Sequence, residues 1–425
     1  MTFSIHTFGC KVNIYESEYL INLMQNNGYQ YQEITDNHPS DIYIINTCTV
    51  TNEADKKARK LFNHLRNNYP NAILIVCGCY SQLNPNKINA DIIIGNKYKS
   101  LIPSLITEYL QTKKTIIKVE DISETNFEDM YINRFVNHTR AFVKIQDGCN
   151  AFCSYCTIPY ARGGLRSKDF QTVINEVNEL VNNGYGEIIL TGIHTGRYGL
   201  EHHTNLEKLL TELVKIPNLF RIRLSSIEIN EITNGIIKLI KEKPIMAKHL
   251  HIPLQSGSDT ILSSMNRQYD MEYFYKRIAY IRQEIPDISI TTDLIVRFPG
   301  ETNELFQETI TNLEHLKFTK IHTFPYSKRD GTVAATMKNQ VEGTTKKCRV
   351  HEVLHLSEKF ESVYYQNCLN NTYVGLVETR KDNKKIVVTS NYIPVEVITD
   401  LPNNSQVTIK ITKVAGGKVA GKIIN

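Results

Sequence analysis

The sequence lacks any long hydrophobic run, because no apolar stretch approaches the ~20 residues that a membrane-spanning helix requires. Its first residues, Met1 to His6, lack the basic flank and apolar core of a secretory signal peptide. A strong charge of either sign is also missing, since the formal net charge is only +5. These absences predict a cytoplasmic protein without a membrane segment, and its hydrophobic content of 41% is ordinary for a globular chain.

Nine cysteines are present in this chain, for which no secretion signal is predicted. Disulfides are rare in such proteins, so this number of cysteines indicates metal binding or redox chemistry. The length of 425 residues allows two or three domains, each with a hydrophobic core of its own.

Three of the cysteines lie within one short loop: Cys149, Cys153 and Cys156. Three thiolates so close together can hold three irons of a [4Fe–4S] cube and leave the fourth iron open to a cofactor. This spacing, with Tyr155 before the last cysteine, is typical of enzymes that form radicals from S-adenosylmethionine. A zinc site and a redox thiol pair are the alternatives. Zinc usually needs a fourth ligand nearby, and both His138 and His194 are poor candidates.

Three further cysteines each follow a predicted strand, and these strands span residues 3–8, 41–45 and 72–76. The cysteines are Cys10, Cys48 and Cys79. Helical patterns at 17–27 and 53–68 separate the strands, and a fourth apolar run follows at 92–95. This alternation predicts an open parallel α/β sheet, in which functional loops gather at the carboxyl ends of the strands.

We therefore expect these three cysteines to converge in space. Three independent buried cysteines are the alternative. Cys77 lies inside the apolar run before Cys79, and we interpret it as a core residue, with a third cluster ligand as the less favoured reading.

From Arg140 onward, strand–helix alternation repeats six times. The strands are predicted at 141–145, 187–190, 221–224, 249–252, 289–295 and 320–324, with helices such as 171–182, 205–214 and 271–284 between them. A polar or glycine-bearing segment follows each strand, at the face where a parallel barrel places its active site. Six units predict a partial barrel whose open side suits a large substrate. The preceding residues, 112–138, show little periodicity and are interpreted as a linker.

The last segment changes to short strands, predicted at 373–378, 385–389, 394–398 and 406–411. This pattern predicts a small antiparallel β-barrel, a module that often binds nucleic acid. Residues 371–425 contain eight Lys or Arg and four Asp or Glu, which gives +4 of the net charge of +5. Such an excess fits a phosphate-rich partner, and a solvated basic face is the alternative.

With these patterns in place, the sequence resembles the methylthiotransferases of the radical S-adenosylmethionine superfamily over nearly its whole length. The residues that carry the resemblance are CSYCTIPYARG at 153–163, and HIPLQSGS at 251–258 followed by MNR at 265–267. The resemblance implies an N-terminal methylthiotransferase α/β domain at 1–113, a linker at 114–134, a radical core at 135–366, and a TRAM-like RNA-binding barrel at 367–425.

Shorter signals are similar to the enzymes that act on N6-threonylcarbamoyladenosine at position 37 of tRNA. They are GCKVN at 9–13, YARG at 160–163 and GIHTG at 192–196. The enzymes for isopentenyladenosine or for a ribosomal-protein aspartate usually differ at all three places. The sequence departs from the family at Arg297, where glycine is usual, and at Cys348, where a charged residue is usual.

The resemblance implies two [4Fe–4S] clusters and two molecules of S-adenosyl-L-methionine per turnover. Cys149, Cys153 and Cys156 would hold the radical cluster, and Cys10, Cys48 and Cys79 would hold a second cluster that carries the sulfur. Further cofactor contacts are expected from Tyr155, Glu228 and Gln255, although each of these side chains could equally be structural. Sulfur would be inserted at C2 of the base and then methylated, and no residue is assigned as a catalyst.

The implied substrate is a tRNA anticodon stem-loop, whose unpaired bases cost less to extrude than paired ones. A flavodoxin or ferredoxin is the implied electron donor, and no stable protein partner is predicted. Three alternatives stay open: the same chemistry on isopentenyladenosine 37 or a protein aspartate, a radical enzyme without sulfur insertion, and an iron–sulfur RNA-binding scaffold.

Overall fold

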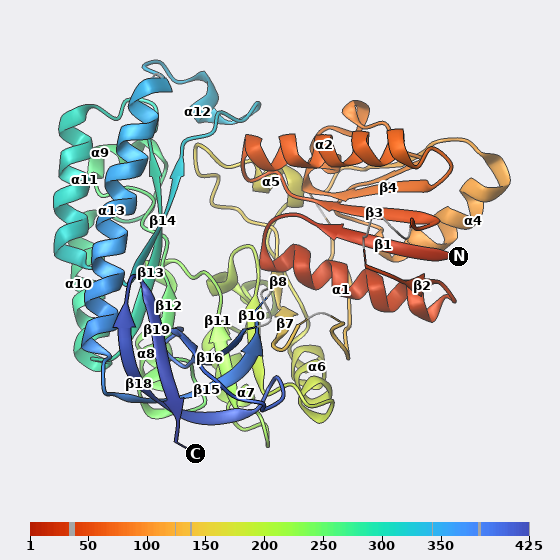
Figure 1. Cartoon of the computed structure of the whole chain (residues 1–425). Helices are drawn as coiled ribbons and strands as arrows, with labels where there is room; N and C mark the ends of the chain where they lie inside the picture. The colour runs from red at the N-terminus through yellow and green to blue at the C-terminus, as the bar shows by residue number, and fades with distance from the viewer. Residues whose placement is uncertain (34–38, 124, 137, 342, 381–383, 425) are drawn as a thin grey trace.

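The computed structural model describes residues 1–33, 39–123, 125–136, 138–341, 343–380 and 384–424. Figure 1 shows an N-terminal α/β body beside a larger α/β body, with the C-terminal strands packed below the larger one. Among the described residues, no helix has the length and apolar character needed to cross a membrane.

The N-terminal body is built on a six-stranded sheet in which all neighbouring strands are parallel, in the order β2-β1-β3-β4-β5-β6. The strands are β1 (Thr2–Thr7), β2 (Gln30–Tyr31), β3 (Ile42–Thr47), β4 (Ile73–Gly78), β5 (Ile92–Ile94) and β6 (Ile116–Lys118). Helices α1 (Lys11–Asn26) and α4 (Ile102–Thr112) bury one face, and α2 (Asn52–Asn68) buries the other (Figure 1). The open parallel α/β sheet is confirmed.

Strand β6 lies inside the predicted linker at 114–134 and pairs with β5. It therefore contributes an edge strand to the N-terminal sheet. Residue 124 of this segment lies outside the described residues. The domain boundaries at 113, 134 and 366 stay predictions.

Helix α1 begins six residues earlier than the predicted start at residue 17. Its first turns bury polar side chains, including Asn13 and Glu16, which are both fully buried. The apolar spacing that predicts an amphipathic helix is interrupted there, because these buried polar side chains lie among apolar ones such as Tyr15, which packs in the core of the partial barrel.

The larger body is a parallel sheet whose six strands follow chain order. They are β7 (Ala141–Lys144), β10 (Glu187–Thr191), β11 (Arg221–Leu224), β12 (His249–His251), β13 (Ser289–Val296) and β14 (Lys320–Pro325). Parallel bridges such as Ser226–His251 join the strand triplets β7-β10-β11 and β12-β13-β14. The predicted six-unit partial barrel is confirmed.

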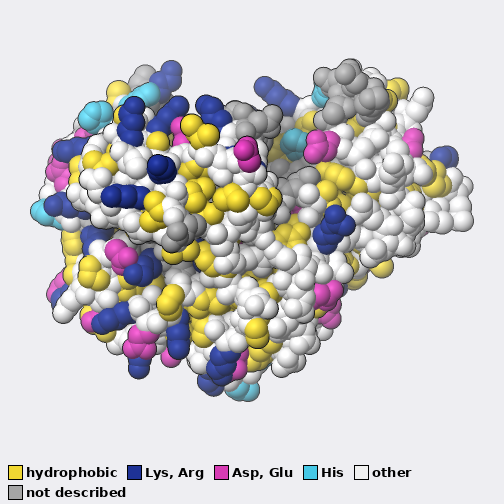
Figure 2. All heavy atoms as spheres, turned by 60° about the horizontal axis from the view of Figure 1, so that its bottom comes forward, with side chains coloured by type: hydrophobic (Ala, Val, Ile, Leu, Met, Phe, Trp, Pro, Cys, Tyr) yellow, Lys and Arg dark blue, Asp and Glu magenta, His cyan; other side chains and the backbone are white. Residues whose placement is uncertain are grey.

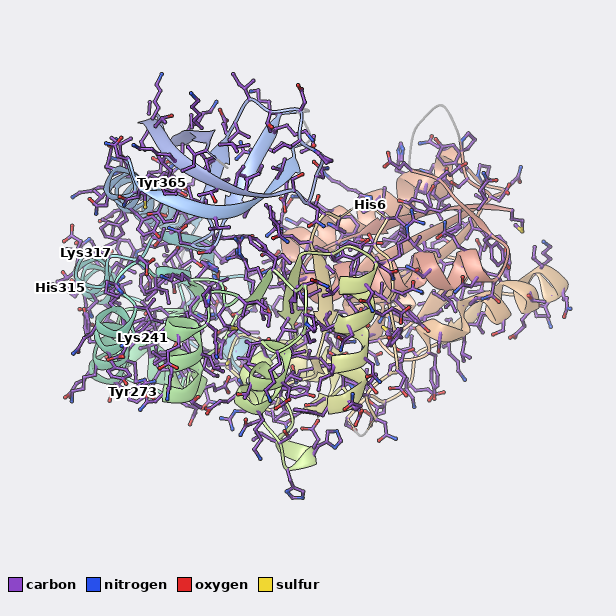
Figure 3. The ribbon with its side chains drawn as sticks, turned by 90° about the horizontal axis from the view of Figure 1, so that it is seen from below. His6, Lys241, Tyr273, His315, Lys317 and Tyr365 are labelled. Carbon is purple, nitrogen blue, oxygen red and sulfur yellow. The ribbon has the colours of Figure 1, made fainter. Side chains whose placement is uncertain are left out.

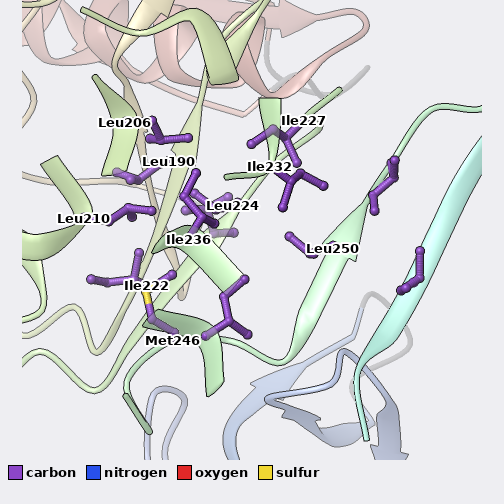
Figure 4. Packing of buried hydrophobic residues seen from close by; sticks show 14 of the residues in the cluster. Leu190, Leu206, Leu210, Ile222, Leu224, Ile227, Ile232, Ile236, Met246 and Leu250 are labelled. Carbon is purple, nitrogen blue, oxygen red and sulfur yellow. The ribbon is translucent and has the colours of Figure 1, made fainter. Parts of the chain in front are cut away.

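The barrel helices are α6 (Phe170–Asn182), α7 (Leu206–Leu213), α8 (Asn234–Glu242), α9 (Asp259–Ser264), α10 (Met271–Glu284) and α11 (Asn303–Leu316). Figure 4 shows how Leu190, Ile222 and Leu224 of the strands pack against Leu210 and Ile236 of the helices. The remaining short elements are α3 (Cys79–Leu83), α5 (Ile158–Arg162), α12 (Val333–Thr336), β8 (Gln146–Asp147) and β9 (Arg166–Ser167).

Helix α13 (Gly343–Asn367) packs along β14 and leads to the C-terminal module; Figure 3 shows Tyr365 where this helix meets the module. The module is a closed barrel of β15 (Thr372–Thr379), β16 (Lys385–Thr389), β17 (Pro394–Glu396), β18 (Gln406–Ala415) and β19 (Lys418–Ile423). The sequence predicted four antiparallel strands here. A fifth strand, β19, closes the barrel by pairing in parallel with β17.

Candidate active site

The three N-terminal cysteines lie at the carboxyl ends of neighbouring strands. Cys10 precedes α1, Cys48 follows β3, and Cys79 is the first residue of α3 after β4. Gly9, with φ +97°, lets the chain pass so close to Cys48 that a Cβ atom there would lie 2.4 Å from the Cys48 Sγ. All three cysteines line one cavity of about 950 Å³. The expected convergence is therefore present.

Cys77 does not line this cavity. Its side chain is fully buried on β4, among Ile44, Ile75 and Ile94 of the sheet core. The interpretation of Cys77 as a core residue is confirmed.

The loop with the other cysteine triad lies between β8 and α5, and donors are directed at all of its sulfurs. The Ala151 amide donates to Cys149 Sγ (3.4 Å), and the Ile158 amide donates to Cys156 Sγ (3.4 Å). Cys153 Sγ accepts a hydrogen bond from Arg267 Nη1 (3.3 Å). Burial raises the pKa of Cys156 to about 12, and a bound metal is the ordinary means of holding such a sulfur as a thiolate. The donor set therefore fits an iron–sulfur cluster.

Cys153 also lines a second cavity, of about 320 Å³, with Glu228, Arg267 and His194. Glu228 forms an ion pair with Arg267, so its carboxylate lies near the cysteine loop, and its predicted contact with the cofactor stays a prediction. Arg267 belongs to the MNR motif and was not predicted as a site residue. It touches both Glu228 and the Cys153 sulfur.

His194 was set aside as a possible ligand because it lies 45 residues beyond Cys149. The structure places its Nδ1 3.3 Å from the Cys149 Sγ and its Nε2 2.7 Å from the carboxylate of Glu231. Burial alone lowers the pKa of His194, but its hydrogen bonds to Cys149 and Glu231 outweigh burial and raise this pKa to about 10. Distance in sequence was thus a poor guide, because β10 returns the chain to the cysteine loop.

Two other predicted cofactor contacts lie near the same face. The Tyr155 ring packs edge-on against Phe298, with 6.4 Å between ring centroids, inside a small hydrophobic cluster. Gln255 follows β12 with φ +67°, and its backbone amide donates to the Asp293 carbonyl (2.9 Å). Their contacts with S-adenosylmethionine stay predictions.

Within the described residues, no three His, Cys, Asp or Glu side chains are arranged to hold a single metal ion. Cys10, Cys48 and Cys79 instead line the larger cavity, and Cys153 lines the smaller one.

Comparison with known proteins gives two family matches, at residues 2–95 to "Uncharacterized protein family UPF0004" and at residues 143–313 to the "Radical SAM superfamily". The chain is 40% identical over 406 residues to the threonylcarbamoyladenosine tRNA methylthiotransferase MtaB of Bacillus subtilis (strain 168). That alignment covers 93% of this chain and 90% of the relative. This chain belongs to the radical S-adenosylmethionine tRNA methylthiotransferases. It is an enzyme, and its cofactors are S-adenosylmethionine and [4Fe–4S] clusters.

This methylthiotransferase is also 34% identical to a tRNA-2-methylthio-N(6)-dimethylallyladenosine synthase of Clostridium tetani (strain Massachusetts / E88), over 99% of this chain and 96% of the relative. Among solved structures, it resembles the radical S-adenosylmethionine methyltransferase TsrM of Kitasatospora setae. The TM-score is 0.59 at 14% identity, over 79% of this chain and 76% of TsrM. At that identity the likeness concerns the fold alone.

The two cysteine triads of the methylthiotransferase are connected by a fully buried arginine, Arg162, at the end of α5. Its Nε donates to Cys79 Sγ (3.2 Å), and its Nη1 lies 2.8 Å from Glu16 and 3.1 Å from Asp147. Since α5 begins two residues after Cys156, the helix that follows one cysteine loop ends in a side chain that contacts the other triad.

Arg162 belongs to a buried ion network that joins the N-terminal body to the partial barrel. Its cations are Lys99, Lys144, Arg162 and Arg166, and its anions are Glu16 and Asp147. Burial alone would raise the pKa of Glu16, but Arg162, Lys144 and Lys99 together lower it far below its usual range. Four cations and two carboxylates leave an excess of two positive charges beside Cys79. An anionic group held by three thiolates fits that excess.

The unusual Arg297 follows β13 and has φ +64°. This left-handed conformation costs a non-glycine residue about 1 kcal/mol, which explains why glycine suits the position. The Arg297 amide donates to the Glu301 carboxylate (2.5 Å), so the turn keeps its hydrogen bond despite the side chain.

Proposed function

We propose that this enzyme inserts sulfur at C2 of N6-threonylcarbamoyladenosine at position 37 of tRNA and methylates it, in the cytoplasm. The observation that supports the proposal is the cavity of about 950 Å³, which forms the open lumen of the partial barrel. Alternate residues of β13 face this lumen, namely Ser289, Thr291 and Asp293. A base extruded into the lumen would lie beside Cys10, Cys48 and Cys79. The greater identity to the threonylcarbamoyladenosine enzyme than to the dimethylallyladenosine enzyme supports the choice of substrate.

Under this proposal, Cys149, Cys153 and Cys156 hold the radical cluster, and Cys10, Cys48 and Cys79 hold the second cluster. When bound, the clusters and S-adenosylmethionine supply the radical that removes hydrogen and the sulfur that replaces it. Arg267 and Arg162 each direct an N–H group at a ligand sulfur, and such hydrogen bonds stabilise the negative charge on a cluster. The proposed electron donor is a flavodoxin or ferredoxin, because the cleavage consumes an electron.

The C-terminal barrel would bind the RNA backbone through the hairpin of β18 and β19. Lys410, Lys413, Lys418 and Lys422 are exposed there, without a hydrogen bond or ion pair among the described residues. Lys410 and Lys422 are direct cross-strand partners, which disfavours the isolated hairpin. Figure 2 shows Lys and Arg side chains over the part of the molecule that contains this barrel. Residues 381–383, which contain one Lys and one Asp and so add nothing to the net charge of the module, lie outside the described residues.

The double substitution Lys410→Gln and Lys422→Gln is expected to weaken RNA binding, because each lysine would neutralise one phosphate. The slope of log Kd against log salt should decrease by about 1.4 to 1.8, since each of the two phosphate contacts contributes about 0.7 to 0.9. Binding of an anticodon stem-loop measured across a salt titration tests this. The double variant Lys241→Gln and Lys276→Gln, whose lysines lie on α8 and α10, is the control. An unchanged slope in the Lys410/Lys422 variant would exclude the hairpin from the interface.

The experiment that tests the proposed function is mass spectrometry of tRNA nucleosides from cells with and without the gene. Loss of the methylthio group from threonylcarbamoyladenosine alone is the expected result. Loss from isopentenyladenosine would keep the chemistry and change the substrate. No change in any tRNA nucleoside would contradict the proposal.

A further inference from the structure

The lumen cavity has four lysines and arginines in its wall: Lys11, Arg140, Arg162 and Lys320. Three of them have carboxylate partners, because Arg140 pairs with Glu378 (2.6 Å), Arg162 with Glu16 (2.8 Å) and Lys320 with Glu361 (3.1 Å). Lys11, the first residue of α1, is half-buried and has neither a hydrogen bond nor an ion pair among the described residues.

No carboxylate of the cavity wall forms an ion pair with Lys11 among the described residues. Glu361 and Glu378 are already engaged by Lys320 and Arg140, and Asp293 lies 3.1 Å from His251. A half-buried ammonium group without a carboxylate partner is costly, so its position facing a cavity indicates an anionic group on the bound ligand.

The surroundings of Lys11 indicate which ligand provides that anion. Lys11 lines the same cavity as Arg140 and Tyr392. The Arg140 guanidinium lies 5.7 Å from the centre of the Tyr392 ring, where the partial barrel meets the C-terminal barrel. A substrate group bound in this cavity between the N-terminal cysteines and that junction would provide the anionic partner of Lys11.

The junction itself carries excess positive charge. Its ion pairs join Arg140, Arg221 and Arg223 to Glu187 and Glu378. Three cations and two carboxylates leave one positive charge uncompensated, and the oppositely charged Lys11 and Asp293 both line the adjoining cavity. Tyr392 lies at this junction, in the turn before β17. The centre of its ring is 4.6 Å from the Arg223 guanidinium and 4.7 Å from the centre of the His249 ring. The wall thus combines positive charge with aromatic surface.

We propose that Lys11, with Arg140 and Tyr392 beside it, binds the carboxylate of the substituent on N6 of the target adenosine. This inference rests on the proposed function. A threonylcarbamoyl group ends in a carboxylate, whereas an isopentenyl group is a hydrocarbon without charge. The subsite therefore makes Lys11 a specificity-determining residue that favours the acidic substituent. It also holds that substituent within the same cavity as Cys10, so the base is positioned near the N-terminal triad.

The test measures Kd for anaerobically reconstituted holoenzyme and three anticodon stem-loop RNAs. The RNAs differ only at N6 of adenosine 37, which carries a threonylcarbamoyl group, its methyl ester or an isopentenyl group. Lys11→Gln should weaken binding of the free acid at least about tenfold, because a charge-assisted hydrogen bond is lost. Binding of the ester and of the isopentenyl RNA should change by less than about twofold, and Lys11→Arg should retain most of the affinity for the acid.

Lys241→Gln is the matched control, because Lys241 lies on the outer helix α8 and is half exposed (Figure 3). An equal loss for all three RNAs would assign Lys11 to a phosphate and overturn the subsite, and so would unchanged binding of the acid. Loss of iron from the Lys11→Gln protein would assign Lys11 to the cluster instead. The proposed function fails separately if the wild-type holoenzyme leaves the threonylcarbamoyl RNA unmodified. If that RNA is modified and Lys11→Gln binds it normally, only the subsite is wrong.

Discussion

Cys10→Ala is expected to lose about half of the bound iron and all sulfur insertion, while still cleaving S-adenosylmethionine. Cys10 lines the lumen cavity with Cys48 and Cys79, whereas Cys153 lines the other cavity. Removing one of three thiolates should therefore destroy one cluster and leave the other. Iron analysis of anaerobically purified protein, together with an assay for 5′-deoxyadenosine, measures both effects.

Cys153→Ala should give the complementary result, with cleavage of S-adenosylmethionine abolished and about half of the iron retained. Cys348→Ala is the control, because Cys348 is exposed on α13 and lies in neither triad. Its iron content and cleavage should match the wild type. A Cys10→Ala protein with its full iron content would show that the N-terminal triad holds no cluster.

Arg162→Met is expected to lower the free energy of unfolding by about 3–5 kcal/mol. The substitution removes a cation that neutralises the buried carboxylates of Glu16 and Asp147. The network joins α1 of the N-terminal body to β8 and α5 of the partial barrel, so the contact between the two bodies should weaken. Denaturant unfolding measures the loss. Lys276→Met, which removes an exposed ion pair with Glu272, should change stability by no more than about 1 kcal/mol.

The same variant has a second expected effect that a purely structural role would not produce. Arg162 donates to Cys79 Sγ, and a hydrogen bond to a ligand sulfur raises the reduction potential of a cluster. Arg162→Met should therefore lower the potential of the second cluster and leave that of the radical cluster unchanged. Redox titration followed by electron paramagnetic resonance measures both. Unchanged potentials with lost stability would restrict Arg162 to a role in packing.

The sequence was sufficient to predict the three-part fold and the convergence of Cys10, Cys48 and Cys79. Parallel strands place their carboxyl ends at one edge, so residues far apart in sequence come together as a consequence of topology. The triad of Cys149, Cys153 and Cys156 could also be predicted, because its cysteines lie close together in the sequence. Gly416 and Gly417, both with positive φ, form the turn before β19 and could have revealed that strand, as a Gly-Gly pair favours a hairpin.

The residues that connect the parts were not predictable in this way. Arg162 appeared only as part of the YARG motif, and its contacts with Glu16 and Cys79 depend on how α5 docks against the N-terminal body. His194 lies beside Cys149 for a similar reason, since β10 is a neighbour of β7. Polar residues that face another domain give no hydrophobic periodicity in the sequence. This is also why the predicted start of α1 is too late.

We propose that this enzyme uses both cysteine triads to modify threonylcarbamoyladenosine. The most direct test incubates purified holoenzyme, S-adenosylmethionine, a reductant and a sulfide source with anticodon stem-loops that carry either threonylcarbamoyladenosine or isopentenyladenosine, followed by nucleoside mass spectrometry. We expect 2-methylthio product from the threonylcarbamoyl RNA only, dependent on both Cys10 and Cys153. Product from the isopentenyl RNA alone, or equal product after Cys10→Ala, would contradict this account.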